Sequence, residues 1–101
     1  MEKRWRYFNY SGRPGEITID VDLPTLKAER FAIDLKLLAN RLGLNTSCFW
    51  KEVSHRPGRY GSIRVLVLKL KGEVQLPEMV WEKIFSLMDE FAEEMDRLKE
   101  S

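Results

Sequence analysis

Hydrophobic and polar residues alternate strictly near the start of the chain, and this alternation predicts a strand. Residues 16–23 place apolar side chains at every second position, with acidic or Thr side chains between them: Ile17, Ile19, Val21 and Leu23 alternate with Glu16, Thr18, Asp20 and Asp22. Successive side chains of a strand point to opposite faces, so one face is buried and the other faces water. Residues 5–10 are aromatic and also typical of a strand, and residues 11–15 predict a turn. Residues 1–15 therefore form either the first strand of a hairpin or a loose arm.

Two longer segments have the period of an α-helix. Residues 25–43 carry two apolar stripes on nearly opposite sides, and residues 76–98 carry one broad stripe. In the first helix we expect Thr25 to cap the first turn and Gly43 to end it. Its main stripe is Ala28, Phe31, Leu35, Leu38 and Leu42, and its second stripe is Leu26, Ile33, Leu37 and Leu44. The main stripe can cover a sheet, whereas the second needs the other helix or another molecule.

Two further strands are expected at residues 47–53 and 63–70, paired as an antiparallel hairpin. The second is apolar on both sides, which is typical of a central strand. The element order is then (β)βαββα. This order predicts an α+β fold, a two-layer sandwich in which two helices cover one face of an antiparallel sheet of three to four strands. With 101 residues, 44% of them hydrophobic and 33% charged, the chain fits one globular domain over residues 1–101.

Charge is distributed unevenly, although the net charge is only +1. Residues 1–15 carry four basic residues against one acidic, and residues 49–71 carry six against one. Residues 73–101 carry three basic residues against nine acidic. A positive zone of this kind can steer an anionic partner, and the opposite zones can also pair with each other within a chain or between two copies.

The loop between the last two strands is the main candidate site. At residues 54–62 it is longer than an ordinary hairpin connection and holds basic and aromatic side chains between glycines. Arg binds phosphates in a bidentate manner, and Tyr stacks on bases. We therefore predict nucleic-acid binding by Lys51, His55, Arg56, Arg59, Tyr60, Arg64, Lys69 and Lys71. The alternatives are a solvated hairpin tip and a contact to a protein partner.

Aromatic residues near the N-terminus allow a second interpretation. Trp5, Tyr7, Phe8 and Tyr10 alternate with basic residues and could form a platform on which single strands stack. Packing of these rings on the core is the more frequent use of aromatic side chains, and we expect it here.

No set of residues indicates catalysis. Asp20, Asp22 and Glu52 could be imagined as a metal-binding set of a nuclease, but the alternation already explains the two aspartates as the wet face of a strand. His55 has no catalytic partner pattern, and Cys48 is expected to be a buried structural thiol. We predict a non-enzymatic protein with no catalytic residue, metal, cofactor or small-molecule substrate, and a metal-dependent nuclease is the minor alternative.

A homodimer is expected because the last strand is apolar on both sides. If two helices cover one face of the sheet, Leu66, Leu68 and Leu70 need cover on the other, and a second copy can supply it. The lone Cys48 and the absence of a long apolar run predict a cytoplasmic protein without a signal peptide or membrane span. The expected function is nucleic-acid binding through the phosphate backbone, and the alternative is a homo-oligomeric protein–protein adaptor or assembly subunit.

Overall fold

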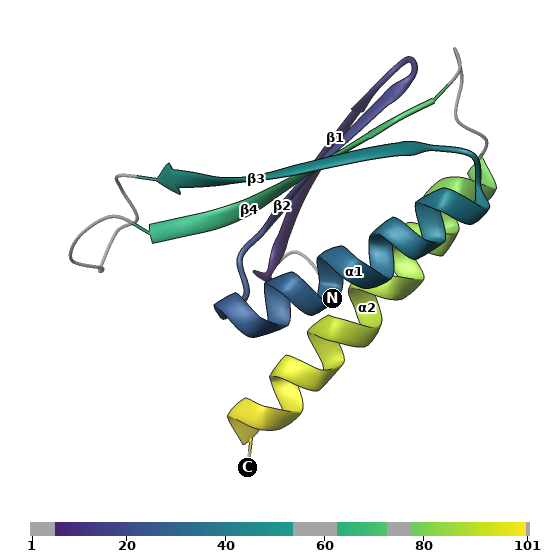
Figure 1. Ribbon diagram of the computed structural model, residues 1–101. Helices are drawn as coiled ribbons and strands as arrows, with labels where there is room; N and C mark the ends of the chain where they lie inside the picture. Colours follow the sequence, from purple (N-terminus) through teal and green to yellow (C-terminus); the bar gives the residue numbers. More distant parts are fainter. Residues whose placement is uncertain (1–5, 54–62, 73–77, 101) are drawn as a thin grey trace.

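Four strands and two helices follow one another in the order ββαββα in the computed structural model, which describes residues 6–53, 63–72 and 78–100. The elements are β1 (Phe8–Arg13), β2 (Glu16–Val21), α1 (Thr25–Arg41), β3 (Asn45–Val53), β4 (Ile63–Lys71) and α2 (Glu78–Glu100) (Figure 1). All strand pairs are antiparallel, and the sheet order is β1-β2-β4-β3. The α+β two-layer sandwich predicted from the sequence is confirmed.

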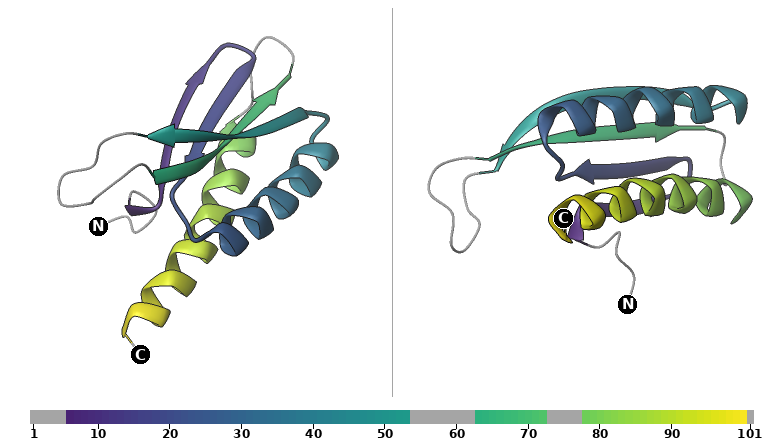
Figure 2. Two further views of the ribbon diagram at one scale, coloured as in Figure 1. Left: turned by 60° about the vertical axis from the view of Figure 1, so that its left-hand side comes forward. Right: turned by 90° about the horizontal axis from the view of Figure 1, so that it is seen from below.

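Both helices lie on one face of the sheet. Figure 2 shows α1 over β3 and β4, and α2 along β1, with β2 between the two helices when the molecule is seen from below. The opposite face of the sheet has no helix among the described residues. Within those residues, no helix is long and apolar enough to cross a membrane.

The core lies between the two layers and is built from alternate strand residues. Antiparallel partners point to the same side of a sheet, and the register aligns Ile17 with Leu70, Ile19 with Leu68 and Val21 with Leu66. These six side chains are buried against the apolar stripes of the helices: Ala28, Phe31 and Leu35 of α1, and Val80, Ile84, Met88 and Phe91 of α2. Burial of one such large side chain stabilises the fold by about 1.5–3 kcal/mol.

The hairpin of β1 and β2 turns later than the sequence predicts. Ser11 and Gly12 belong to β1 rather than to the turn, and the strand continues to Arg13, which pairs with Glu16. The turn itself needs only Pro14 and Gly15, because proline presets the first turn residue and Gly15 adopts a positive φ of 79°. The later turn adds Arg13 to the sheet.

Helix α1 begins without the side-chain cap expected from Thr25. The cap position is Pro24, which makes no side-chain hydrogen bond to the first turn, and Thr25 is already helical. The end of α1 agrees with the sequence, since Gly43 takes a φ of 74° and the amide of Leu44 donates to the carbonyl of Ala39.

The first aromatic residues that the structure describes are packing residues. Tyr7 and Phe8 are buried, and the ring centroid of Phe8 lies 4.8 Å from that of Phe31. The hydroxyl of Tyr7 donates a 2.6 Å hydrogen bond to Oδ1 of Asp96 near the end of α2. These two rings are therefore not exposed for stacking on a base. Trp5 lies outside the described residues.

Candidate nucleic-acid interface

The helix-free face of the sheet collects the basic residues that the structure describes in the strands. Because the buried residues of β2 and β4 occupy the helix side, the residues between them point to the other side. The register gives the same orientation to the matching positions of β1 and β3. The helix-free face thus contains Arg13, Lys51, Lys69 and Lys71, together with Phe49, Val65, Val67 and polar residues.

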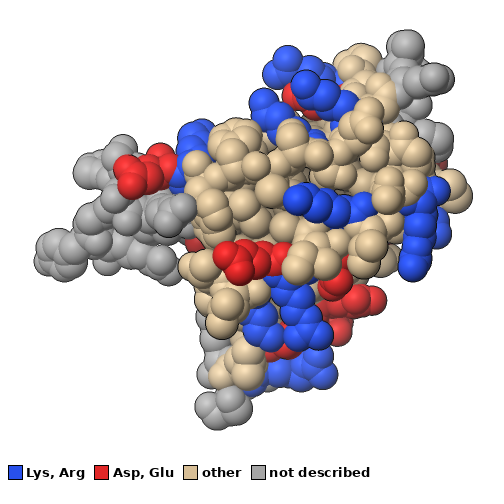
Figure 3. Space-filling view, viewed as in Figure 1, with Lys and Arg blue, Asp and Glu red and all other residues tan. Residues whose placement is uncertain are grey.

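These cations are spread over most of the length of the sheet. Lys51 pairs with Val65 of β4, and Lys71 lies six residues further along the same strand. At about 3.3 Å per residue, this separation is about 20 Å. In Figure 3, Lys and Arg side chains predominate over the upper, sheet layer, whereas the lower, helical layer carries patches of both signs.

Phe49 provides an exposed ring in the middle of this face. Its side chain is 47% exposed, and Nζ of Lys69 lies 5.9 Å from the ring centroid, within the range of a cation–π contact. Its cross-strand partner Val67 is buried, as is Val65 two positions before it. The helix-free face therefore combines buried valine side chains, an exposed aromatic ring and the ammonium groups of lysines.

Acidic side chains reduce the positive charge of this face without balancing it. Among the described residues, Glu16 and Asp20 point to the helix-free side, against the four cations. A carboxylate oxygen of Glu16 lies 4.0 Å from Nζ of Lys71, and both side chains reach water. An exposed pair of this kind is weak, because water screens it, so Lys71 can exchange this partner for a phosphate.

Only part of the predicted binding set can be placed. Lys51, Lys69 and Lys71 lie on the helix-free face, as described above. Arg64 pairs with Glu52 in the register of β3 and β4, but its side chain lies outside the part of the structure that is described. The remaining predicted residues, His55, Arg56, Arg59 and Tyr60, lie outside the described residues.

The predicted dimer interface at Leu66, Leu68 and Leu70 is corrected by the structure. All three side chains are buried in the core under the helices of their own chain. The physical reason is the register: β4 pairs with β2, and its leucines lie beside the buried isoleucines of that strand. The face that the helices leave open carries the β-branched residues of β4 instead.

Two residues of the face were not selected from the sequence. The sequence pattern predicts that Arg13 lies in a turn, and it places Phe49 on one side of a strand without indicating a binding role. The signal for Arg13 was available, because a Pro-Gly pair suffices for a two-residue turn and places the residue before it in the strand.

The other candidate residues are not brought together. Among the described residues, no group of three or more His, Cys, Asp or Glu side chains could hold a metal ion, so Asp20, Asp22 and Glu52 do not form such a set. Cys48 is exposed rather than buried. It lies in β3, which forms one edge of the sheet.

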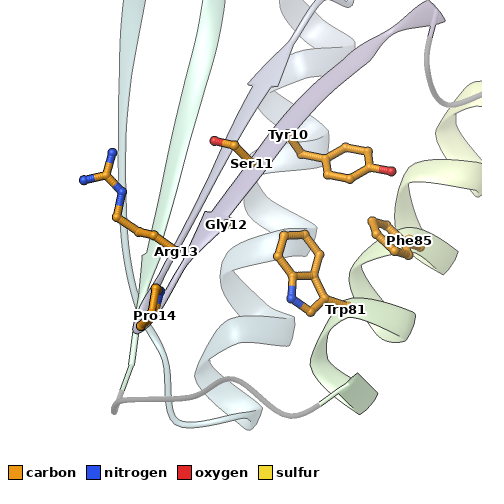
Figure 4. Close-up of a pocket in the computed structure, with 7 residues that line it drawn as sticks. All are labelled: Tyr10, Ser11, Gly12, Arg13, Pro14, Trp81 and Phe85. Atoms are coloured by element: carbon orange, nitrogen blue, oxygen red, sulfur yellow. The ribbon is translucent and has the colours of Figure 1, made fainter.

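A cleft lies at the opposite edge of the sheet, between β1 and α2. It has a volume of about 550 Å³ and is lined by Tyr10, Ser11, Gly12, Arg13, Pro14, Trp81 and Phe85. Figure 4 shows the three aromatic rings on one side of β1 and the side chains of Ser11 and Arg13 on the other. The ring centroids of Tyr10, Trp81 and Phe85 lie 5.0–5.9 Å apart.

Comparison with known proteins gives no relative from which a function could be transferred. No protein-family model matches the chain, and no curated protein or solved structure is significantly similar to it. The functional argument therefore depends on the geometry of this chain alone.

Proposed function

We propose that this protein binds nucleic acid through the helix-free face of its sheet, with most contacts made to the phosphate backbone and none of them catalytic. The observation that carries the proposal is the common orientation of Arg13, Lys51, Lys69 and Lys71 on the helix-free face, which also carries the exposed ring of Phe49. Helices occupy the other face, so these cations are not needed to close the core.

The spacing of the cations fits a polyanion better than a small anion. They extend over about 20 Å of sheet, which is the length of several successive phosphates of a nucleic-acid strand. Phe49 can stack on an unpaired base, and stacking needs no particular sequence. The proposal includes His55, Arg56, Arg59 and Tyr60, because their loop joins β3 to β4 at the end where Lys51 lies.

The test is binding of fluorescently labelled single-stranded and duplex oligonucleotides, followed by anisotropy between about 50 and 200 mM salt. We expect the affinity to fall steeply as salt rises. Lys69→Glu and Lys51→Glu should each weaken binding to every sequence, and neutral Gln at either position should lower the logarithmic salt slope by about 1. Lys83→Glu, an equal charge change on the exposed side of α2, is the matched control.

Two results would contradict the proposal. One is an affinity for the oligonucleotides that does not depend on salt. The other is an equal loss of affinity in the Lys83→Glu control, which would show that only the net charge matters. We also propose a cytoplasmic location, where nucleic acid is accessible and an exposed thiol such as that of Cys48 stays reduced.

A second function, self-association, is supported by the outer side of α1. Leu26 is 80% exposed, Ile33 60% and Leu37 56%, and their spacing of seven and four residues places them in one stripe. This is the second stripe expected from the sequence, except that Leu44, beyond the helix end, is buried. We propose that two copies pack α1 against α1 in antiparallel orientation with Ile33 near the twofold axis.

Charge placement favours a second copy as the partner of this stripe. With Ile33 on the axis, Glu29 of one copy lies opposite Lys36 of the other, and the symmetry repeats the pair. Ile33→Lys should convert a dimer to a monomer in light scattering at micromolar concentration, whereas Glu82→Lys on α2 should not. A wild-type protein that is monomeric under these conditions would exclude this interface.

A further inference from the structure

The outer edge of β1 differs from the other edge of the sheet in its lack of protection. No strand among the described residues pairs with β1 on the side away from β2. Its residues Phe8–Gly12 carry no charge and no proline, whereas β3 at the opposite edge carries Lys51 and Glu52. Proteins usually protect an open strand edge with charges, prolines or bulges, so an uncharged edge is a ready template for another strand.

The alternation of backbone hydrogen bonds shows that Gly12 points its amide and carbonyl to this open side. The amide of Asp22 donates to the carbonyl of Tyr7 at 2.7 Å, so Tyr7 and Asp22 form a hydrogen-bonded pair. Hydrogen-bonded and non-hydrogen-bonded pairs alternate along an antiparallel ladder, which makes Gly12 and Ile17 a non-hydrogen-bonded pair. The backbone of Gly12 is exposed to solvent.

The aromatic cleft lies directly beside this edge. Helix α2 runs along β1, with Trp81 against Gly12 and with Phe85 and Trp81 against Tyr10. One wall of the cleft is therefore strand backbone and the other is aromatic. A strand edge beside a helix, with an apolar cleft between them, is the arrangement by which peptides are bound through strand addition.

We propose that the cleft between β1 and α2 binds an extended peptide, which adds to the outer edge of β1 as a further strand. Side chains of an added strand alternate between the two faces of the sheet. One peptide residue thus points toward the rings of Tyr10, Trp81 and Phe85, while its neighbour points toward the face that carries Arg13. Among the residues that the structure describes, no acidic side chain lines the cleft. The ligand is accordingly a peptide with a bulky apolar residue directly next to an acidic one.

The exposed backbone of β1 favours a peptide over a nucleotide as the ligand of this cleft. Only another polypeptide strand supplies the repeating amides and carbonyls that continue a ladder from Gly12. Pro14 has no amide hydrogen, so the added ladder ends at the turn and the bound segment is short. The site is separate from Phe49 and Lys69, which lie on the helix-free face in the half of the sheet formed by β3 and β4.

In the first step of the test, the full chain is immobilised and short linear peptides that bind it are selected from a displayed random library. In the second step, the enriched peptide is added to the ¹⁵N-labelled protein and followed by NMR. We expect an apolar–acidic dipeptide in the enriched sequences and a shift of the Trp81 indole resonance. Amide exchange of Gly12 should slow by about tenfold or more on saturation, because its hydrogen becomes bonded. This measurement uses the unaltered protein and does not depend on a variant that folds.

Variants distinguish this site from the nucleic-acid face. Arg13 belongs to both proposed sites, so Arg13→Glu tests only the charge preference of the peptide: it should weaken binding of the enriched peptide by about tenfold and favour basic in place of acidic residues in a new selection. Trp81→Leu should weaken peptide binding and leave oligonucleotide binding unchanged, and Lys69→Glu should do the reverse. The peptide site can thus fail while the nucleic-acid proposal stands, and the opposite also holds.

Three outcomes would overturn the inference. The library yields no sequence enriched on the native chain over the Trp81→Leu chain; the bound peptide leaves the exchange of Gly12 unchanged; or a single-stranded oligonucleotide shifts the Trp81 indole and competes with the peptide. The last result would assign the cleft to the nucleic acid.

Discussion

Gly12 of β1 and Trp81 of α2 are in such close contact that no side chain fits between them. A Cβ atom added at Gly12 would lie 2.6 Å from Cζ2 and 3.2 Å from Cη2 of the indole. The ring is held on its other sides by Tyr10 and Phe85, whose centroids lie 5.9 and 5.4 Å away. The glycine thus allows α2 to approach the edge strand, and the approach forms the aromatic cleft.

Gly12→Ala should therefore destabilise the protein by about 1–2 kcal/mol, because the indole must leave its position against two other rings. Urea unfolding measures the loss, and the near-UV circular dichroism of the folded state should change with the ring position. Ser11→Ala, one position earlier on the opposite face, is the control. If Gly12→Ala matches this control in both measurements, the close contact has no energetic role. When Gly12→Ala is introduced into the Trp81→Leu variant, most of its destabilising effect should disappear, because the indole that the added methyl group displaces is absent.

The hydrogen bond from Tyr7 to Asp96 ties the beginning of the sheet to the end of α2. Both residues are buried, and the guanidinium of Arg6 lies 3.5 Å from the same carboxylate oxygen. Tyr7→Phe should cost about 1.5–3 kcal/mol in the free energy of unfolding, since a hydrogen bond to a charged group is lost. A double-mutant cycle with Asp96→Asn isolates the pair. A coupling energy near zero in that cycle would show that the contact does not stabilise the fold.

Glu94 and Lys27 connect α2 to α1, and this contact predicts a pH dependence of stability. The hydrogen bond from Lys27 is the main cause that holds the pKa of Glu94 below its usual value of 4.5. A lowered pKa in the folded state means that the stabilisation is present above pH 4.5 and is lost as the pH falls through the lowered pKa.

Lys27→Met should accordingly reduce the free energy of unfolding at neutral pH, and the difference from wild type should shrink in acid. Glu93→Gln, an exposed neighbour of Glu94, is the control and should show no such dependence. Denaturant unfolding across pH 3 to 7 gives the comparison, and a difference that stays constant over this range would refute the link to Glu94.

Phe49 gives a test of base stacking that is independent of charge. Phe49→Ala should weaken the binding of single-stranded oligonucleotides by about 1–3 kcal/mol. The salt slope should stay unchanged, because a stacked ring, unlike a phosphate contact, releases no counterion. Phe49→Tyr retains the ring and should bind like wild type. Equal weakening of duplex and single strand by Phe49→Ala would exclude stacking on an unpaired base.

Local periodicity determined the elements and their faces in this protein. The two-residue alternation of β2 and the 3.6-residue period of the helices depend only on backbone geometry. Sequence periodicity is therefore sufficient to predict the element order and to place Leu26, Ile33 and Leu37 in one stripe of α1, whereas the exposure of that stripe comes from the structure. The same rule showed that Phe49 and Lys51 share one face of β3.

Which face of the sheet the helices would cover was decided only by the tertiary structure. Strand β4 is apolar on both sides, so its own pattern fits either orientation, and only pairing with β2 places Leu66, Leu68 and Leu70 inside. The contact of Gly12 with Trp81 likewise joins residues far apart in the sequence. Such choices depend on the total burial achieved by the whole chain, which no local window of residues contains.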